Sequence, residues 1–183
     1  MITIRSGEFK NKKLQIPPVG VRPTSDKIRQ AIFNVLMHAD FAPPMANARV
    51  LDAFAGTGAM GLEALSRGAA HAWFMENDPA VGKILQQNLA IAAARATLLV
   101  ADAGAPERAP EGMNMVFLDP PYSKNLLLSA VSALQAAEWI SEKTLLIIET
   151  AAQEALLLPE DYVILDQRKY GNTRINFATL SRK

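Results

Sequence analysis

One stretch indicates the fold class of this sequence. It reads Val50-Leu51-Asp52-Ala53-Phe54-Ala55-Gly56-Thr57-Gly58-Ala59-Met60-Gly61. Its apolar start is typical of a short buried strand over residues 50–54. Gly56, Gly58 and Gly61 then follow in a G-x-G-x-x-G pattern that leads into a helix. Glycines let the backbone turn tightly and come close to a ligand. This order is typical of a nucleotide-binding βα unit, which NAD enzymes share.

Apolar strands continue to alternate with helices on the C-terminal side of this unit. The predicted strands are residues 72–76, 97–100, 115–118, 145–149, 162–165 with an extension toward 170, and 174–180. The predicted helices are residues 59–66, a helix that starts at Asp78-Pro79, and residues 126–139. This pattern predicts an α/β, Rossmann-like fold with a seven-stranded, mostly parallel sheet and an antiparallel last strand. Ligands of such folds bind outside the carboxyl ends of the strands.

The N-terminal side carries a small extension. Residues 2–16 alternate weakly and predict a β-hairpin with a basic tip at Lys10-Asn11-Lys12-Lys13. A proline-rich break follows. Next comes a helix with Thr24 or Ser25 as its N-cap, which runs to about His38.

Carboxylates stand at the predicted ends of three strands. Asp52 ends the first core strand, Glu76 ends the second at twenty residues after Gly56, and Asp102 follows the third. Glu76 occupies the usual place of a ribose-binding acid, and Asp102 stands where an adenine amine can be met. Asp52 opposes a pyrophosphate but can hold the amino group of an amino-acid-like ligand, directly or through water. This set favours S-adenosylmethionine over NAD. The predicted cofactor-binding residues are Asp52, Ala53, Phe54, Gly56, Gly58, Gly61, Glu76, Asn77, Asp102 and Ala103.

Asp119-Pro120-Pro121-Tyr122 follows the apolar strand at residues 115–118 and forms a stiff loop, because proline has a fixed φ and no N–H. Asp119 and the Pro120 carbonyl can accept both hydrogens of a nucleobase amine, which restores the nitrogen lone pair, while Tyr122 stacks on the base. The charge of Asp119 also favours the cationic nitrogen that forms during attack. We therefore predict methyl transfer to such an amine, with Asp119, Pro120, Pro121 and Tyr122 as catalytic residues. The loop by itself accepts adenine or cytosine as readily as guanine.

The net charge of +1 conceals basic ends on an acidic body. Residues 1–30 hold seven basic residues against two acidic ones, and residues 167–183 hold five basic residues and no acidic one. Such ends suit contact with a polyanion, although solvated termini that keep a protein soluble give the same pattern. The predicted RNA-binding residues are Arg5, Phe9, Lys10, Lys12, Lys13, Arg22 and Thr24. Among them, Phe9 either stacks on a base or packs internally.

Three stretches together resemble the RsmD family of bacterial guanine-N2 methyltransferases of 16S ribosomal RNA. They are Arg22-Pro23-Thr24-Ser25-Asp26, residues 54–68 around the glycine loop, and Asp119-Pro120-Pro121-Tyr122. The resemblance covers nearly the whole chain and implies a class I S-adenosylmethionine-dependent methyltransferase. It implies donor contacts from the glycine loop, Glu76 and Asp102, with residues 119–122 at the target guanine. It also implies that the partner is 16S rRNA within the small ribosomal subunit or its late precursor.

The hairpin departs from the family pattern. The family usually shows an arginine-isoleucine-isoleucine-glycine-glycine opening and an arginine-glycine-arginine-lysine tip. The corresponding residues here are Thr3-Ile4-Arg5-Ser6-Gly7 and Lys10-Asn11-Lys12-Lys13. Lysine keeps the positive charge but loses the bidentate phosphate geometry of arginine.

Length and composition set further limits. At 183 residues and 50% hydrophobic, the chain can form a single compact unit, with an N-terminal extension at 1–44 and a methyltransferase core at 45–183. There is no cysteine, no signal-peptide pattern and no apolar run of membrane-spanning length, so a cytoplasmic protein without membrane contact is expected. His38 and His71 lack partners at ligand spacing, so no metal is expected. Nothing in the sequence demands a dimer, and a monomer is expected.

Three alternative functions stay open. A DNA adenine or cytosine amino-methyltransferase also flips bases, but it usually carries a target-recognition domain for which 183 residues leave no room. An NAD-dependent oxidoreductase shares the glycine loop, yet it leaves the Asp-Pro-Pro-Tyr loop without a purpose. A non-catalytic RNA-binding module would retain the donor site as a vestige. Titration with S-adenosylmethionine and with NADH separates the methyltransferases from the oxidoreductase.

Overall fold

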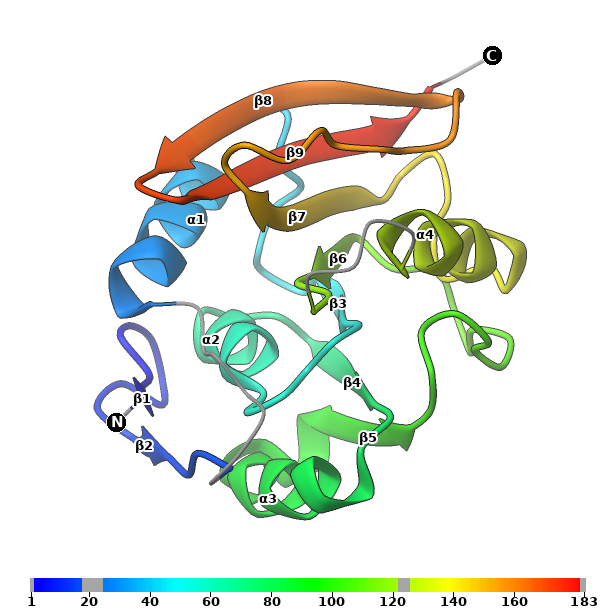
Figure 1. The fold of residues 1–183 in the computed structure, drawn as a ribbon. Helices are drawn as coiled ribbons and strands as arrows, with labels where there is room; N and C mark the ends of the chain where they lie inside the picture. The colour runs from blue at the N-terminus through cyan, green and yellow to red at the C-terminus, as the bar shows by residue number, and fades with distance from the viewer. Residues whose placement is uncertain (1, 18–24, 122–125, 182–183) are drawn as a thin grey trace.

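The computed structural model describes residues 2–17, 25–121 and 126–181, and within them the predicted seven-stranded sheet is present (Figure 1). Its strands are β3 (Arg49–Asp52), β4 (His71–Glu76), β5 (Ala96–Val100), β6 (Met115–Leu118), β7 (Leu145–Ala151), β8 (Tyr162–Tyr170) and β9 (Thr173–Leu180). The strand order is β5-β4-β3-β6-β7-β9-β8. Pairs from β5 to β7 are parallel, whereas β9 is antiparallel to β7 and β8. The Rossmann-like fold with an antiparallel last strand is therefore confirmed.

Helices cover both faces of the sheet (Figure 1). They are α1 (Asp26–His38), α2 (Ala59–Ser66), α3 (Pro79–Leu89) and α4 (Leu126–Ala136), with a 3₁₀ helix η1 (Ala90–Arg95) after α3. α1, α2 and α3 share a core cluster with Phe117 and Ile147, while α4 shares a second cluster with Leu118 and Ile148. Because successive strand residues point to opposite faces, the two clusters lie on opposite sides of the sheet. None of the helices in the described ranges is long and apolar enough to cross a membrane.

The predicted helix starts are confirmed, but one predicted helix end is wrong. The Ser25 hydroxyl accepts a backbone N–H at 3.3 Å and caps α1, and the Asp78 carboxylate accepts one at 2.7 Å and caps α3. α4 ends at Ala136 rather than at residue 139. Glu138 takes a φ of +65°, and the turn there carries the Trp139 ring into the core. Burial of that large ring explains why the apolar helical pattern continues past the true helix end.

The N-terminal hairpin pairs β1 (Ile2–Thr3) with β2 (Lys13–Leu14) and docks on the end of α2. The Glu8 N–H donates to the Ser66 carbonyl at 2.8 Å. Gly7 lies so close to α2 that an added Cβ would stand 1.7 Å from the Ser66 carbonyl oxygen, and its φ is +81°. This position therefore requires glycine for two independent reasons, space and backbone conformation.

A second set of hydrogen bonds connects the segment after β2 with the glycine loop. The buried Asn88 side chain of α3 exchanges two hydrogen bonds with the Gln15 backbone, at 2.8 and 3.0 Å. It also donates to the Thr57 carbonyl at 2.9 Å. The extension and the core further share one hydrophobic cluster, which includes Ile4 and Leu65. The division of the chain at residue 44 stays a prediction.

A buried group of charges joins α1 to α2. The Glu63 carboxylate accepts from Arg67 at 2.9 Å and lies 3.6 Å from the Arg29 guanidinium, with Glu63 and Arg29 side chains each 1% exposed. The same carboxylate accepts the Arg5 backbone N–H at 2.8 Å. Arg29 is one of the seven basic residues in 1–30, but it pairs with Asp26 at 2.8 Å and with Glu63, so the expectation that the basic residues of this end face a polyanion is wrong for this side chain. Its charge is neutralised inside the protein, where a polyanion does not reach it.

Candidate active site

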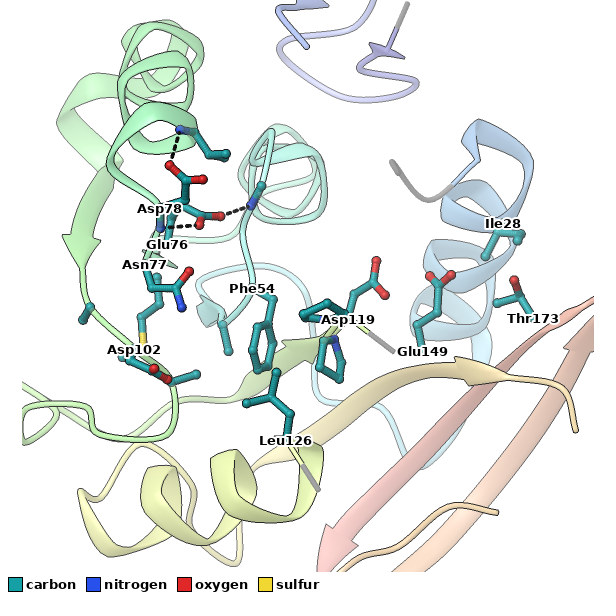
Figure 2. Close-up of a pocket in the computed structure, with 18 of the residues that line it drawn as sticks. Ile28, Phe54, Glu76, Asn77, Asp78, Asp102, Asp119, Leu126, Glu149 and Thr173 are labelled. Atoms are coloured by element: carbon teal, nitrogen blue, oxygen red, sulfur yellow. Dashed lines mark hydrogen bonds between the residues drawn. The ribbon is translucent and has the colours of Figure 1, made fainter. Parts of the chain in front are cut away.

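A cavity of about 490 Å³ opens at the carboxyl ends of the parallel strands, where the fold predicts it (Figure 2). Its volume lies within the usual range of small-ligand sites. Residues at the ends of β3, β4, β5, β6 and β7 line it, together with the starts of α1, α3, α4 and β9. In the described part of the chain, no group of three or more His, Cys, Asp or Glu residues could hold a metal ion.

One half of the cavity holds most of the predicted cofactor-binding residues. Those that line it are Ala53, Phe54, Gly56, Glu76, Asn77, Asp102 and Ala103. Asp52, Gly58 and Gly61 are not part of the lining. Their positions behind the cavity wall indicate roles in shaping the loop rather than in touching a ligand.

The Asp52 carboxylate organises the glycine loop from behind. It is 5% exposed and accepts the Gly61 N–H at 3.0 Å, at the start of α2. Burial raises the pKa of Asp52 to about 7, the Gly61 hydrogen bond lowers it in part, and the nearby charge of Glu76 raises it again. A carboxyl group that titrates near neutrality therefore stands directly beneath the loop.

The two remaining glycines allow the start of α2 to pack tightly on β4 and α3. An added Cβ on Gly61 would stand 2.3 Å from the Phe74 ring, and one on Gly58 would stand 2.6 Å from Leu85. Gly58 also has a φ of +77°. The glycine pattern was predicted for ligand approach, but here Gly58 and Gly61 serve helix packing, while Gly56 alone of the three lines the cavity.

Glu76 links the glycine loop to the start of α3. One carboxylate oxygen accepts the Gly56 N–H at 3.0 Å, and the other accepts the Asp78 N–H at 2.9 Å (Figure 2). A carboxylate has roughly four acceptor positions, so Glu76 can accept a ligand hydroxyl as well. On the next strand end, Asp102 accepts the Gly104 N–H at 2.7 Å, which orients its carboxylate at the cavity wall.

The other half of the cavity lies around the loop after β6. Asp119, Pro120 and Pro121 all line it, as predicted for the catalytic residues, whereas Tyr122 lies outside the described residues. In Figure 2 the Phe54 ring lies between this half and the half that contains Asn77. The predicted cofactor-binding residues (the donor side) and the residues around the loop after β6 (the loop side) therefore line one continuous cavity.

Besides Met75, Asp78, Val81, Ala101 and Leu126, sequence reasoning missed four residues of the lining, namely Ser25 and Ile28 at the start of α1, Glu149 near the end of β7 and Thr173 at the start of β9. Glu149 carries the same signal that led to Asp52 and Asp102, an acid at the end of an apolar strand. The other three give no local signal, because they reach the cavity through the packing of α1 and through the antiparallel insertion of β9.

Among the predicted RNA-binding residues, Lys10, Lys12 and Lys13 are exposed on the hairpin. The Arg5 side chain forms an ion pair with Asp26 at the start of α1. The hairpin thus presents three lysines outward, while its arginine connects it to the first helix.

Three further residues of that set have other placements. Phe9 is only 8% exposed, and the Arg95 guanidinium lies 5.3 Å from its ring centroid, so the ring takes the internal-packing alternative. Arg22 and Thr24 lie outside the described residues.

Comparison with known proteins gives a consistent likeness over the whole chain. A family model described as Conserved hypothetical protein 95 matches residues 2–179. The chain is 38% identical to ribosomal RNA small subunit methyltransferase D of Escherichia coli K12, across 85% of this chain and 77% of that protein. It is 32% identical to the Haemophilus influenzae protein of the same name, across 93% and 89%. A solved structure described as putative methyltransferase yhhF from Escherichia coli superposes with a TM-score of 0.85 at 31% identity, covering 100% and 99%.

Proposed function

Because this chain belongs to the RsmD family, we propose that it methylates the exocyclic N2 amine of a guanosine in 16S rRNA of the small ribosomal subunit. S-adenosylmethionine is the methyl donor, and the chain is a methyltransferase. The observation that carries this proposal is the single cavity that joins Glu76 and Asp102 to Asp119 and Pro120. A donor and a flipped base can meet in such a cavity without water between them.

The donor-side residues match the chemistry of S-adenosylmethionine. When bound, this cofactor supplies an electrophilic methyl group on a sulfonium. Glu76 offers carboxylate oxygens to the ribose hydroxyls from the end of β4, and Asp102 offers one to the adenine amine from the end of β5. Gly56 lines the cavity beside them, which lets the backbone come close to the ligand. Asp52 acts through the loop that it holds, because it is not part of the lining.

On the loop side, Asp119 and the Pro120 carbonyl accept the two hydrogens of the target amine. The amine nitrogen then becomes more tetrahedral and its lone pair is available for attack. The new N2–carbon bond forms as the carbon–sulfur bond breaks, and positive charge develops on N2 beside the Asp119 carboxylate. N2 then releases one proton, which leaves N2-methylguanosine and S-adenosylhomocysteine. Tyr122 is proposed to stack on the base.

The exposed lysines of the hairpin, Lys10, Lys12 and Lys13, supply the RNA contact in this proposal. Asn88 bonds to both Gln15 and Thr57, so it connects the segment after the hairpin to the donor loop. The lysines themselves are not part of the cavity lining, so they hold RNA outside the cavity. We further propose that the protein acts in the cytoplasm as a monomer, on the assembled small subunit or its late precursor.

The test is transfer of a radiolabelled methyl group to small subunits that lack the modification, with free 16S rRNA and DNA as parallel substrates. The proposal predicts label on guanine N2 in subunits and little label on DNA. Label on adenine or cytosine would refute the guanine assignment, and efficient labelling of DNA would favour a DNA amino-methyltransferase. A titration with S-adenosylmethionine and NADH accompanies it, because saturable binding of NADH alone would refute the methyltransferase assignment.

A further inference from the structure

Two acids occupy matching positions on neighbouring strands of the loop-side half. β6 and β7 are parallel, and their register pairs Leu118 with Ile148. Asp119 and Glu149 are the next residues on each strand, and both line the cavity. Adjacent strands lie about 4.8 Å apart, so the two acids lie next to one another on the side of the sheet where the parallel strands have their carboxyl ends.

Both acid side chains project toward the face of the sheet that α1 covers. Phe117 and Ile147, two residues before each acid, pack in the cluster that contains α1 side chains. Side chains in a strand alternate between faces, so Asp119 and Glu149 point to that same face. Figure 2 shows both carboxylates on the side of α1, with Ile28 and Thr173 beyond Glu149.

A buried amide bonds to the residues of β7 on both sides of Glu149. The Asn176 side chain of β9 is 0% exposed and donates to the Ile148 carbonyl and to the Thr150 hydroxyl, each at 3.2 Å. Its own carbonyl oxygen accepts from Gln167 of β8 at 2.6 Å. Glu149 therefore lies on a backbone that Asn176 holds at Ile148 and that β9 holds by strand pairing with Ile175, which suits a positioning task.

From this geometry, we propose that Glu149 selects guanine by accepting the N1–H of the target base, while Asp119 serves the neighbouring N2 amine. The inference rests on the proposed function and adds a residue that determines base specificity. Guanine presents an N1–H donor beside its N2 amine. Adenine and cytosine instead present an acceptor nitrogen beside their amines, and this lone pair would face the Glu149 carboxylate. An unsatisfied or repulsive contact of this kind discriminates strongly between bases.

Replacement of Glu149 by glutamine tests the proposal, because an amide keeps the shape but can donate to an acceptor nitrogen. The substrates are small subunits reconstituted with 16S rRNA that carries either guanosine or 2-aminopurine at the methylated position. 2-Aminopurine keeps the N2 amine but has an acceptor at N1. The matched control is Glu142→Gln, an exposed acid that precedes β7, at the end of the strand away from the cavity.

Wild-type protein should prefer the guanosine substrate, and Glu149→Gln should lower kcat/KM for guanosine by about 10- to 100-fold. The variant should also reduce the preference for guanosine over 2-aminopurine by about tenfold or more, while affinity for S-adenosylmethionine stays unchanged. Glu142→Gln should behave like wild type. If Glu149 had only a structural role, the Glu149→Gln variant would have an equally lowered kcat/KM for both substrates, and the preference for guanosine would stay unaltered.

Two results would overturn the inference. One is a wild-type protein that methylates both substrates equally well, which needs no variant and therefore does not depend on folding of Glu149→Gln. The other is a Glu149→Gln variant that binds S-adenosylmethionine normally and keeps the full wild-type preference. If the wild-type protein transfers no methyl group to the guanosine substrate, the proposed function fails and the inference fails with it.

Discussion

The Asp52 carboxylate accepts the Gly61 N–H at 3.0 Å and, at 5% exposure, does so almost entirely away from solvent. This bond connects the end of β3 to the start of α2, across the loop that lines the donor side of the cavity. Burial raises the pKa of Asp52 to about 7. The loop therefore depends on a group whose charge changes near neutral pH.

This raised pKa predicts how stability depends on pH. An unfolded chain releases the Asp52 proton near 3.8, while the folded protein keeps it until about pH 7. Between these values the folded state binds the extra proton, so this group makes stability fall as pH rises, and above pH 7 its contribution is constant. Asp52→Asn should remove this part of the slope. Urea unfolding at several pH values between about 4 and 7 measures it, with the exposed Asp40→Asn as control. Equal slopes for wild type and Asp52→Asn would contradict this account.

Gly7→Ala should detach the hairpin from α2. The added Cβ would collide with the Ser66 carbonyl, and alanine is strained at a φ of +81°. A cost of about 1–3 kcal/mol is expected from the backbone strain, and the collision adds to it. Affinity for RNA should fall, whereas affinity for S-adenosylmethionine should change less. Gly112→Ala is the control, because an added Cβ there meets nothing within 4 Å. Hydrogen exchange of the hairpin amides checks this prediction. If these amides stay as protected in Gly7→Ala as in wild type, Gly7 is not required for docking of the hairpin on α2.

Glu63→Gln should destabilise the fold strongly. It removes the counter-charge of Arg67 and one of the two counter-charges of Arg29, which is buried with a side-chain exposure of 1% and keeps Asp26 at 2.8 Å. Breaking a buried pair from one side costs about 3–5 kcal/mol. The exposed Glu138, which pairs with Arg108 at 2.8 Å, gives the matched control. Glu138→Gln should cost less than about 1 kcal/mol. Urea unfolding gives the loss of unfolding free energy for each variant. Equal losses for Glu63→Gln and Glu138→Gln would show that burial of the Glu63 ion pairs contributes nothing to stability.

Removal of the three exposed lysines of the hairpin should weaken RNA binding and flatten its salt dependence. Each lost phosphate contact lowers the slope of log K against log salt concentration by about 0.7 to 0.9. The RNA affinity of a variant with alanine at Lys10, Lys12 and Lys13 is measured at several salt concentrations and compared with that of wild type. Lys143→Ala removes an exposed charge at the amino end of β7 and should leave the slope unchanged. A triple variant with the wild-type slope would show that RNA binds elsewhere.

The sheet and the edge that lines the cavity were predictable because both depend on local patterns. Buried parallel strands are apolar runs, and the acids Asp52, Glu76 and Asp102 mark where three of them end. The helix caps at Ser25 and Asp78 are equally local. Such features follow from the chain within a few residues, so the sequence alone predicts them.

Other features depend on contacts between distant segments. Asp26, three residues before Arg29 on α1, is a local partner at 2.8 Å, but only the packing of α1 on α2 shows that Arg29 is buried against Glu63 as well. Ser25 and Thr173 reach the cavity because α1 and β9 lie beside its edge. The roles of Gly58 and Gly61 in helix packing were likewise hidden, because a ligand-binding glycine and a packing glycine look alike in sequence.

Asp119 is proposed to act on the methyl-accepting amine at one end of a cavity whose other end holds the donor. The most direct measurement compares Asp119→Ala with wild type in two assays, methyl transfer to unmethylated small subunits and equilibrium binding of S-adenosylmethionine. Methyl transfer by Asp119→Ala should fall by at least about 100-fold with donor affinity unchanged, since Asp119 lines the loop side of the cavity. An Asp119→Ala variant that still methylates guanine N2 at the wild-type rate would contradict this role of Asp119.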